Sequence, residues 1–327
     1  MLLMCSKTMC QTIGGATVFN FLNQANSANL SALGGVNISS INNSVGLAFN
    51  NPALLRKNID KNYEASFNSF FAGIKHYNFM ASKFFSEKNI VIAGGVNFFN
   101  YGSITQTDAA GNILGNFNLN DFVAQIQVSK QYKEKWFYGS TFKFISSNYG
   151  IFKSNGIAVD VGLCYFDSSK NLQFGFIIKN IGTQLKTYTN NGIRTEIPFD
   201  VQFGFTKKLE KAPFQFSLTA QHLQAFNTLY NDTLFNAQEG DVNNKNRNGL
   251  KKIVAHLIIA TEVFVGDKIK ATLSYNFSRG NDLKIYQSAN GLSGCNLGLS
   301  LLLKKFNFYY ATGFYQQNMF HQVSIGF

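Results

Sequence analysis

Few residues in this chain have the types and spacing that a catalytic or metal site requires. The histidines, at positions 76, 222, 256 and 321, are scattered, and the chain has no His-x-x-x-His or Cys-x-x-Cys pair. Metal sites usually combine ligands at such short spacings. The chain also has no Gly-x-Ser-x-Gly nucleophile motif and no phosphate-binding P-loop. We therefore predict no catalytic residue, no metal and no cofactor, and expect a protein that is not an enzyme.

Four charged residues, Asp160, Lys179, Asp200 and Lys270, occupy positions that the strand pattern described below turns toward the interior. Buried charges need partners, because an isolated buried charge is costly. We expect these side chains to pair across the interior rather than to act as acid and base.

The four cysteines fall into two groups by their position in the chain. Cys5 and Cys10 lie in residues 1–10, which resemble the end of a signal peptide but lack the basic start and long apolar stretch of a complete one. We interpret residues 1–10 as a signal-peptide remnant, and a plain disordered terminus is the alternative. Cys164 and Cys295 are expected on opposite faces of their strands, so we predict no disulfide between them.

Composition and periodicity predict the elements that hold these side chains. Only 14% of residues are charged while 15% are aromatic, and the mean hydropathy is −0.05. Disorder is excluded by the aromatic content, and no apolar run approaches the roughly 18 to 20 residues of a membrane-spanning helix. Between Ile157 and Tyr165, large apolar residues alternate with Ala158, Asp160, Gly162 and Cys164. One face of such a strand is apolar and the other is small or polar.

This alternation recurs from Tyr63 to the last residue and predicts fourteen strands. Most are long enough for a tilted crossing of the hydrocarbon layer, which takes about 9 to 11 residues. The expected ranges are 63–72, 75–85, 90–100, 119–131, 136–147, 156–166, 172–181, 198–207, 213–223, 252–264, 268–278, 293–303, 306–314 and 319–327.

The links between strands alternate in length. Links after even-numbered strands are short and polar, whereas most others are long, with about 18 residues from Tyr101, 16 from Gly182, 27 from Gln224 and 14 from Arg279. Short turns on one rim and long loops on the other are typical of bacterial outer-membrane barrels. We predict an all-β transmembrane antiparallel β-barrel of about 14 strands, in contact with outer-membrane lipid.

The chain ends in an apolar stripe formed by Val323, Ile325 and Phe327. This stripe resembles the C-terminal signal that outer-membrane assembly machinery reads on its barrel substrates. A final strand that ends in Phe without such a role is the alternative.

The net charge of +12 has two interpretations. Many lysines lie on the expected short-turn rim, where they would face inner-leaflet phosphates or an acidic periplasmic partner. Alternatively, they only keep the turns solvated. Nucleic-acid binding is not predicted, because a lipid-embedded chain offers no water-facing basic surface with readout groups. These rim lysines are Lys83, Lys88, Lys130, Lys133, Lys135, Lys170, Lys207, Lys208, Lys211, Lys268, Lys304 and Lys305.

The first 60 residues do not follow the barrel pattern. Short apolar runs, which include Phe19, Phe21, Leu33 and Leu54, are separated there by small and polar residues. A tail would not need these apolar side chains, so we expect a segment folded in the lumen. The predicted organisation is a signal-peptide remnant at 1–10, a plug segment at 11–60 and the barrel at 61–327.

An ordered set of short motifs resembles the PorV/PorQ branch of FadL-like fourteen-stranded barrels, which belongs to the type IX secretion system of Bacteroidetes, and the opening is most similar to PorQ-type members. The resemblance covers essentially the whole chain. Asn29 departs from it, since arginine is common at that place. The matching residues are Phe21, Leu22, Ser27, Ala28, Gly34, Gly35, Asn51, Pro52 and Ala53 in the plug segment and Asn180 and Gly182 in the barrel.

The resemblance implies a non-enzymatic outer-membrane anchor of a cell-surface attachment complex. Its partners would be a PorZ-like protein, which recognises an anionic lipopolysaccharide, and a sortase assembly of PorU/PorV type. A FadL-like channel for uptake of hydrophobic molecules is the alternative, and a general porin is disfavoured by the filled interior. Asp232-Thr233-Leu234 also resembles the O-glycosylation pattern of Bacteroidetes.

Overall fold

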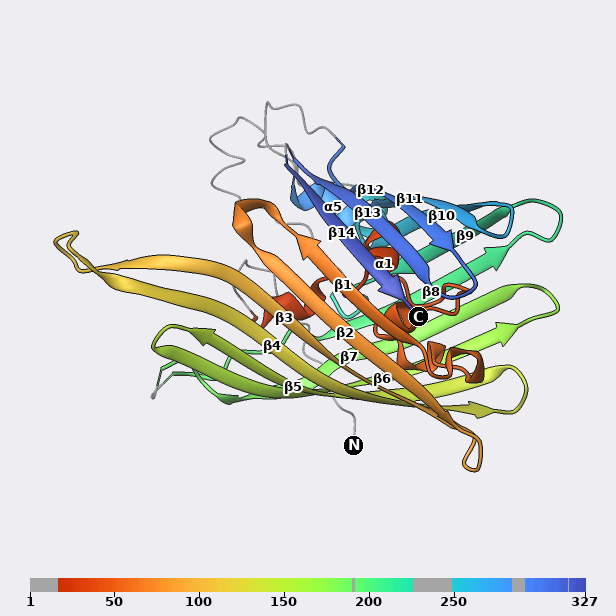
Figure 1. Ribbon diagram of the computed structural model, residues 1–327, viewed down its shortest axis with the longest axis horizontal. Coiled ribbons are helices and arrows are strands. Elements are labelled where there is room, and N and C mark those ends of the chain that lie inside the picture. Colours follow the sequence, from red (N-terminus) through yellow and green to blue (C-terminus); the bar gives the residue numbers. More distant parts are fainter. Residues whose placement is uncertain (1–16, 190–191, 226–248, 284–291, 317) are drawn as a thin grey trace.

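The computed structural model describes residues 17–189, 192–225, 249–283, 292–316 and 318–327, in which fourteen antiparallel strands close into a barrel (Figure 1). Each strand pairs with its neighbours in the sequence, and β1 (Tyr63–Ser69) pairs with β14 (Asn318–Gly326) to close the ring. The prediction of an all-β barrel of about 14 strands is confirmed. The other strands are β2 (Lys75–Phe85), β3 (Ile90–Thr107), β4 (Ile113–Tyr132), β5 (Trp136–Tyr149), β6 (Phe152–Asp167), β7 (Leu172–Lys186), β8 (Asp200–Lys208), β9 (Phe214–Ala220), β10 (Leu257–Val265), β11 (Ile269–Asn276), β12 (Cys295–Leu302) and β13 (Asn307–Tyr315).

Side chains alternate between the two faces of the barrel wall. In β5, the outward-facing Tyr138, Phe142 and Phe144 are exposed, whereas Thr141 and Lys143 are buried inside. Most strands repeat this arrangement, so the outer surface is rich in aromatic and aliphatic side chains. In water such an apolar surface would make the barrels associate, whereas in a membrane it is solvated by hydrocarbon. The closed ring of strands also pairs its backbone N–H and C=O groups by hydrogen bonds between neighbouring strands. The barrel is therefore built to span an outer membrane.

The third and fourth strands are longer than the sequence pattern predicts. The expected loop from Tyr101 is wrong, because β3 and β4 continue as a hairpin that extends past the neighbouring strands in Figure 1. A register shift lies between Asn100 and Ser103, and Gly102 has a φ of 83°, which glycine adopts without a Cβ clash. Neither face of the outer hairpin is consistently apolar, so the period-2 signal fades although the ladder continues.

Several other boundaries also differ from the predictions. β7 runs to Lys186, although a loop was expected from Gly182. The expected start of the tenth strand is a helix, α4 (Gly249–Ala255), and the expected end of the eleventh lies in α5 (Phe277–Asp282). A helix pairs its own backbone groups and needs no neighbouring strand. No helix in the described parts of the chain is long and apolar enough to cross a bilayer.

Residues 18–62, here called the inner segment, fold inside the barrel before the chain enters β1 (Figure 1). Most of their side chains are buried, and inward-facing side chains of distant strands bond to their backbone. Ala28 N donates to Ser324 Oγ at 2.8 Å, and Gln127 Nε2 donates to Phe49 O at 3.4 Å. The polar wall thus finds partners within the barrel. The inner segment contains η1 (Asn20–Asn23), α1 (Ala28–Ala32), α2 (Val45–Ala48), η2 (Pro52–Leu54) and η3 (Lys57–Ile59), and η4 (Phe71–Gly73) links β1 to β2.

Glycines on the inner face mark where the inner segment lies directly against the wall. Gly139 and Gly162 are paired on β5 and β6, and a Cβ on Gly139 would come within 2.9 Å of the Pro52 side chain. On β7, a Cβ on Gly175 would collide with the carbonyl of Ile38. Larger residues at these places would displace the inner segment, because a packed interior tolerates little extra volume.

A buried ion pair ties α1 to the wall. Lys270 Nζ on β11 lies 2.6 Å from Glu262 Oε1 on β10 and donates to Asn29 Oδ1 at 2.9 Å. Both charged side chains are 1% exposed. An arginine in place of Asn29 would offer no acceptor and would set a second positive charge beside Lys270. An asparagine at position 29 therefore suits the ammonium group that it faces.

Replacing Lys270 by methionine should destabilise the barrel by about 3 kcal/mol, because Glu262 would remain buried without its counter-charge. The urea midpoint measures this loss through the fluorescence of Trp136, the only tryptophan of the chain. The double variant Lys270→Met/Glu262→Gln should recover most of the stability. Lys268→Met, in the turn after β10, is the matched control, and a parental midpoint for Lys270→Met would contradict this account.

Replacing Gly162 by leucine should push η2 off the wall and speed tryptic cleavage after Arg56 and Lys57. Gly94→Leu is the matched control, because a Cβ at this outward-facing position meets only Gln125 O, at 3.8 Å. Limited proteolysis followed by mass spectrometry measures both rates. Cleavage of Gly162→Leu at the rate of the control would show that this contact does not hold the inner segment.

Candidate functional site

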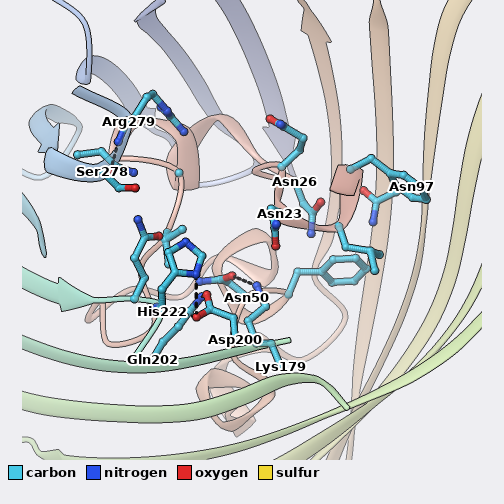
Figure 2. Close-up of a pocket in the computed structure, with 18 of the residues that line it drawn as sticks. Asn23, Asn26, Asn50, Asn97, Lys179, Asp200, Gln202, His222, Ser278 and Arg279 are labelled. Carbon is cyan, nitrogen blue, oxygen red and sulfur yellow. Dashed lines mark hydrogen bonds and ion pairs between the residues drawn. The ribbon is translucent and has the colours of Figure 1, made fainter. Parts of the chain in front are cut away.

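A cavity of about 290 Å³ lies between the inner segment and the barrel wall, near the rim that carries the long loops. Its lining comes from the inner segment, from several wall strands and from α5. Figure 2 shows the labelled side chains gathered around this space, including Asn23 and Asn26 of the inner segment and Gln202 of β8. This cavity is the candidate functional site.

Two lysines bring charge to the cavity. Lys143 Nζ lies 2.6 Å from Asp160 Oδ2, and these two side chains form a buried ion pair within the wall. Lys179 Nζ donates to Asn50 Oδ1 at 2.7 Å, which joins β7 to the inner segment. Asp160 is thus paired inside the barrel, but its partner is a residue that the sequence reasoning did not single out. The inward position of Lys143 in the alternation of β5 was the available signal.

A second polar group stands at the ends of β8 and β9. His222 Nδ1 lies 3.2 Å from Asp200 Oδ1, and the backbone N of His222 donates to the same atom at 2.7 Å. Burial lowers the pKa of His222, but the Asp200 carboxylate raises it by more, so this pKa lies above its ordinary value. Arg279 donates to Asn296 Oδ1 at 3.0 Å and stacks on the ring of Tyr315.

Amide side chains are the most frequent polar groups of the lining. Gln125 Nε2 and Gln202 Oε1 are buried and have no hydrogen-bond partner among the described residues. A buried donor and a buried acceptor that remain unpaired are unusual in a folded protein. The lining amides are Asn23, Gln24, Asn26, Asn50, Asn97, Gln125, Gln202, Gln221 and Asn276.

The barrel wall is interrupted between β7 and β8. Within the described residues, these strands pair only as far as Lys179↔Asp200, and the remainder of β7, to Lys186, pairs with β6. Thr195, in the link that follows β7, donates its backbone N to Gln184 Oε1 at 3.0 Å. Side-chain bonds therefore close this seam where the backbone ladder stops.

Asn180 and Gly182, the predicted barrel motif residues, lie where the seam begins. Asn180 has a φ of 57°, its N donates to Asp160 Oδ1 at 2.7 Å, and its Nδ2 donates to Pro198 O at 2.8 Å. Gly182 packs so closely on the backbone of Ile157 that a Cβ would collide with it. The motif thus joins β6, β7 and the link to β8.

Phe21, Leu22, Ser27 and Ala28 hold the first part of the inner segment. Phe21 packs against Phe99 of β3, with ring centroids 5.6 Å apart, and Leu22 packs against the same apolar cluster. The Ser27 side chain caps α1 by accepting from the backbone N three residues later, at 3.2 Å. Ala28 begins that helix and bonds to β14.

The remaining plug motif residues form two turns. Gly34 and Gly35 follow α1 with φ values of 92° and 86°, which favour glycine. Asn51 Oδ1 accepts from Ala53 N at 3.0 Å and so caps η2, in which Pro52 is the first residue. These residues shape the path of the inner segment, and only Gly35 among them lines the cavity.

Val323, Ile325 and Phe327 lie on the outward face at the end of the chain, while the alternating Gln322 and Ser324 are buried in the interior. Phe327 N donates to Tyr63 O at 2.8 Å, next to the junction of β1 and β14. The apolar stripe is therefore available to lipid, and its recognition by assembly machinery stays a prediction.

The short-turn rim places several lysines beside aromatic rings. Lys133 Nζ lies 5.4 Å from the centroid of Tyr132, and Lys208 Nζ lies 4.4 Å from that of Phe264. Aromatic side chains of this kind mark membrane interfaces. The proposed contact of the rim with phosphates or an acidic partner stays a prediction.

The described residues contain no group of three or more His, Cys, Asp or Glu that could hold a metal ion. Cys164 and Cys295 are free thiols. The possible signal-peptide remnant at 1–10 and the pattern Asp232-Thr233-Leu234 lie outside the described residues. The side chains that line the cavity offer hydrogen bonds and charges to a ligand.

No protein-family model matches the chain, and no curated protein matches it in sequence. The TodX monoaromatic hydrocarbon channel, as its deltaS2 mutant, is similar in structure, with a TM-score of 0.52 and 12% identity over 93% of this chain and 97% of that chain. Its deltaS2S3 mutant gives the same TM-score and identity over 92% and 97%. The KdgM porin has a TM-score of 0.37 and 7% identity over 81% and 98%. The likeness to TodX shows the fold, which is a FadL-like outer-membrane β-barrel.

Proposed function

We propose that this chain is a non-enzymatic outer-membrane component of the type IX secretion system. It would anchor the cell-surface attachment complex that processes and attaches secreted cargo. The observation that carries the proposal is the filled lumen. The inner segment begins beside the long link before β8, where Val18 N donates to Glu196 O at 2.8 Å. It ends beside the short-turn rim, where Ser82 Oγ donates to Ile59 O at 2.5 Å. A barrel filled in this way suits a rigid holder better than an open pore.

The residues of the family resemblance support the same role. Ser27 and Asn51 cap short helices of the inner segment, and Asn180 joins the wall at the seam. All three maintain the filled barrel, and none is a nucleophile placed beside a general base. A role in holding partners needs this rigidity and requires no reaction in the lumen.

The hairpin of β3 and β4 offers a surface for partner proteins. It extends beyond the other strands at the long-loop rim (Figure 1), which faces outward in barrels of this kind. Ile104, Ile113 and Leu114 on this hairpin are 48%, 74% and 61% exposed. Large apolar side chains that are exposed outside the membrane favour protein contact. We assign this hairpin to the PorZ-like partner, beside a sortase of PorU/PorV type.

Deleting the gene in the source bacterium should release the PorZ-like partner from the membrane and leave cargo unprocessed in the medium. Complementation with Ile104→Ser/Ile113→Ser/Leu114→Ser should not restore attachment, because the apolar contact would be lost. Thr105→Ser/Asn116→Ser, on the same hairpin, is the matched control and should restore it. Immunoblots of membrane and medium, with affinity purification of the barrel from detergent, measure both effects. Normal attachment in the deletion strain would rule out the anchor role.

A FadL-like channel for uptake of hydrophobic molecules is the second candidate. The fold shared with the TodX channel and the seam between β7 and β8 favour it. The polar lining of the cavity argues against it. A hydrocarbon would exclude water from Lys179 and Asp200 and would offer them no hydrogen bond in its place.

Under the anchor proposal, expressing this chain in a Gram-negative host without a hydrocarbon channel should not increase uptake of radiolabelled toluene. Asn180→Ala, which removes the bond from Asn180 Nδ2 to Pro198 O at the start of the seam, should also leave uptake at the background level. Cells that express TodX are the positive control. Uptake above background that rises further in Asn180→Ala would favour the channel.

A further inference from the structure

Two side chains that line the cavity each carry a buried amide atom that the described residues leave unpaired. Gln125 and Gln202 are 5% and 2% exposed, and they reach the cavity from β4 and β8, which are different parts of the wall. Gln125 Nε2 is a donor without an acceptor, and Gln202 Oε1 is an acceptor without a donor. The second amide atom of Gln202 is already used, since its Nε2 donates to Asp200 Oδ2 at 2.6 Å. The free atoms call for a ligand that can both accept and donate hydrogen bonds.

The charged side chains around the cavity already have ion-pair or hydrogen-bond partners. Lys143 is paired with Asp160, and Asp200 is paired with His222. Lys179 and Arg279 are held by amide oxygens of Asn50 and Asn296, respectively. Asp282 accepts from Ser278 Oγ at 3.1 Å. A ligand with a full charge would have to compete with these contacts, whereas a neutral polar ligand would leave them in place.

Aromatic rings complete the lining. Phe21, Phe49 and Phe99 border the cavity and are otherwise buried. The volume of about 290 Å³ is close to the lower end of small-molecule pockets, roughly 300 to 1,000 Å³. It has room for roughly ten water molecules. A single sugar ring with its hydroxyl groups occupies a comparable space, and its C–H faces pack well on aromatic rings.

We propose that this cavity binds a compact neutral molecule rich in hydroxyl groups, of the size of a monosaccharide. Its hydroxyl groups donate to Gln202 Oε1, accept from Gln125 Nε2 and take the place of water at Asn23 and Asn26. Hydroxyl groups reproduce the hydrogen bonds of the water that they displace, which a hydrocarbon cannot do. This proposal goes beyond the anchor function and does not depend on it.

Isothermal titration calorimetry on the full chain in a detergent without a sugar headgroup tests the proposal, with D-glucose, D-galactose and N-acetyl-D-glucosamine as probes and toluene as the apolar comparison. At least one sugar should bind with one site per chain, and toluene should not compete with it. Gln125→Leu and Gln202→Met should each weaken binding at least tenfold. Gln106→Leu, on the outer hairpin, is the matched control and should bind as the parent does.

Asn26→Leu provides a second variant if the buried substitutions fail to fold, because Asn26 lies on the inner segment and is partly exposed. It should also weaken binding at least tenfold. Heat-dependent migration in gel electrophoresis verifies that each variant is a folded barrel. Absence of binding by all three sugars would overturn the proposal, as would equal affinity in the parent and in every folded cavity variant.

Discussion

The inner wall of this barrel is polar although the barrel stands in a membrane, and the rest of the structure follows from that constraint. Every second residue of a strand faces the lumen, and side chains such as Gln127, Thr141 and Ser324 are fully enclosed there. Enclosed polar groups are costly unless they are hydrogen-bonded. The inner segment supplies the missing partners through its backbone. The strands in turn hold the inner segment in place, because its helices are too short to be stable alone.

Small and charged residues adapt this filling to the shape of the lumen. Gly139, Gly162 and Gly175 remove side-chain volume where the inner segment touches the wall. Lys270 pairs with Glu262 beside α1 and also donates to the side-chain oxygen of Asn29. Such specific contacts stiffen the barrel, and stiffness suits the anchor role that we propose. The filling is incomplete near the long-loop rim, and the polar cavity lies there.

The sequence pattern was most informative where lipid lies on one side and the lumen on the other. Alternation alone assigns Phe142 and Thr141 to opposite faces, because lipid on one side and the polar lumen on the other require different residue types at successive positions. The pattern was least informative beyond the membrane. Around Ser103 and Ile113 both faces meet water, so the long hairpin has no alternating signal, and α4 and α5 lie in links where no periodicity distinguished a helix from a strand end.

The sequence by itself determined the strand number, the two faces of the wall and the class of membrane barrel, because these depend on local periodicity and on the length of each crossing. Only the tertiary structure decided which lumen-facing side chains contact one another. Asp160 pairs with Lys143, Asp200 pairs with His222, and Gln125 and Gln202 border one cavity although 77 positions separate them in the printed sequence. These contacts depend on strand register and on the path of the inner segment. Both of these depend on the closure of the whole barrel rather than on any local run of residues.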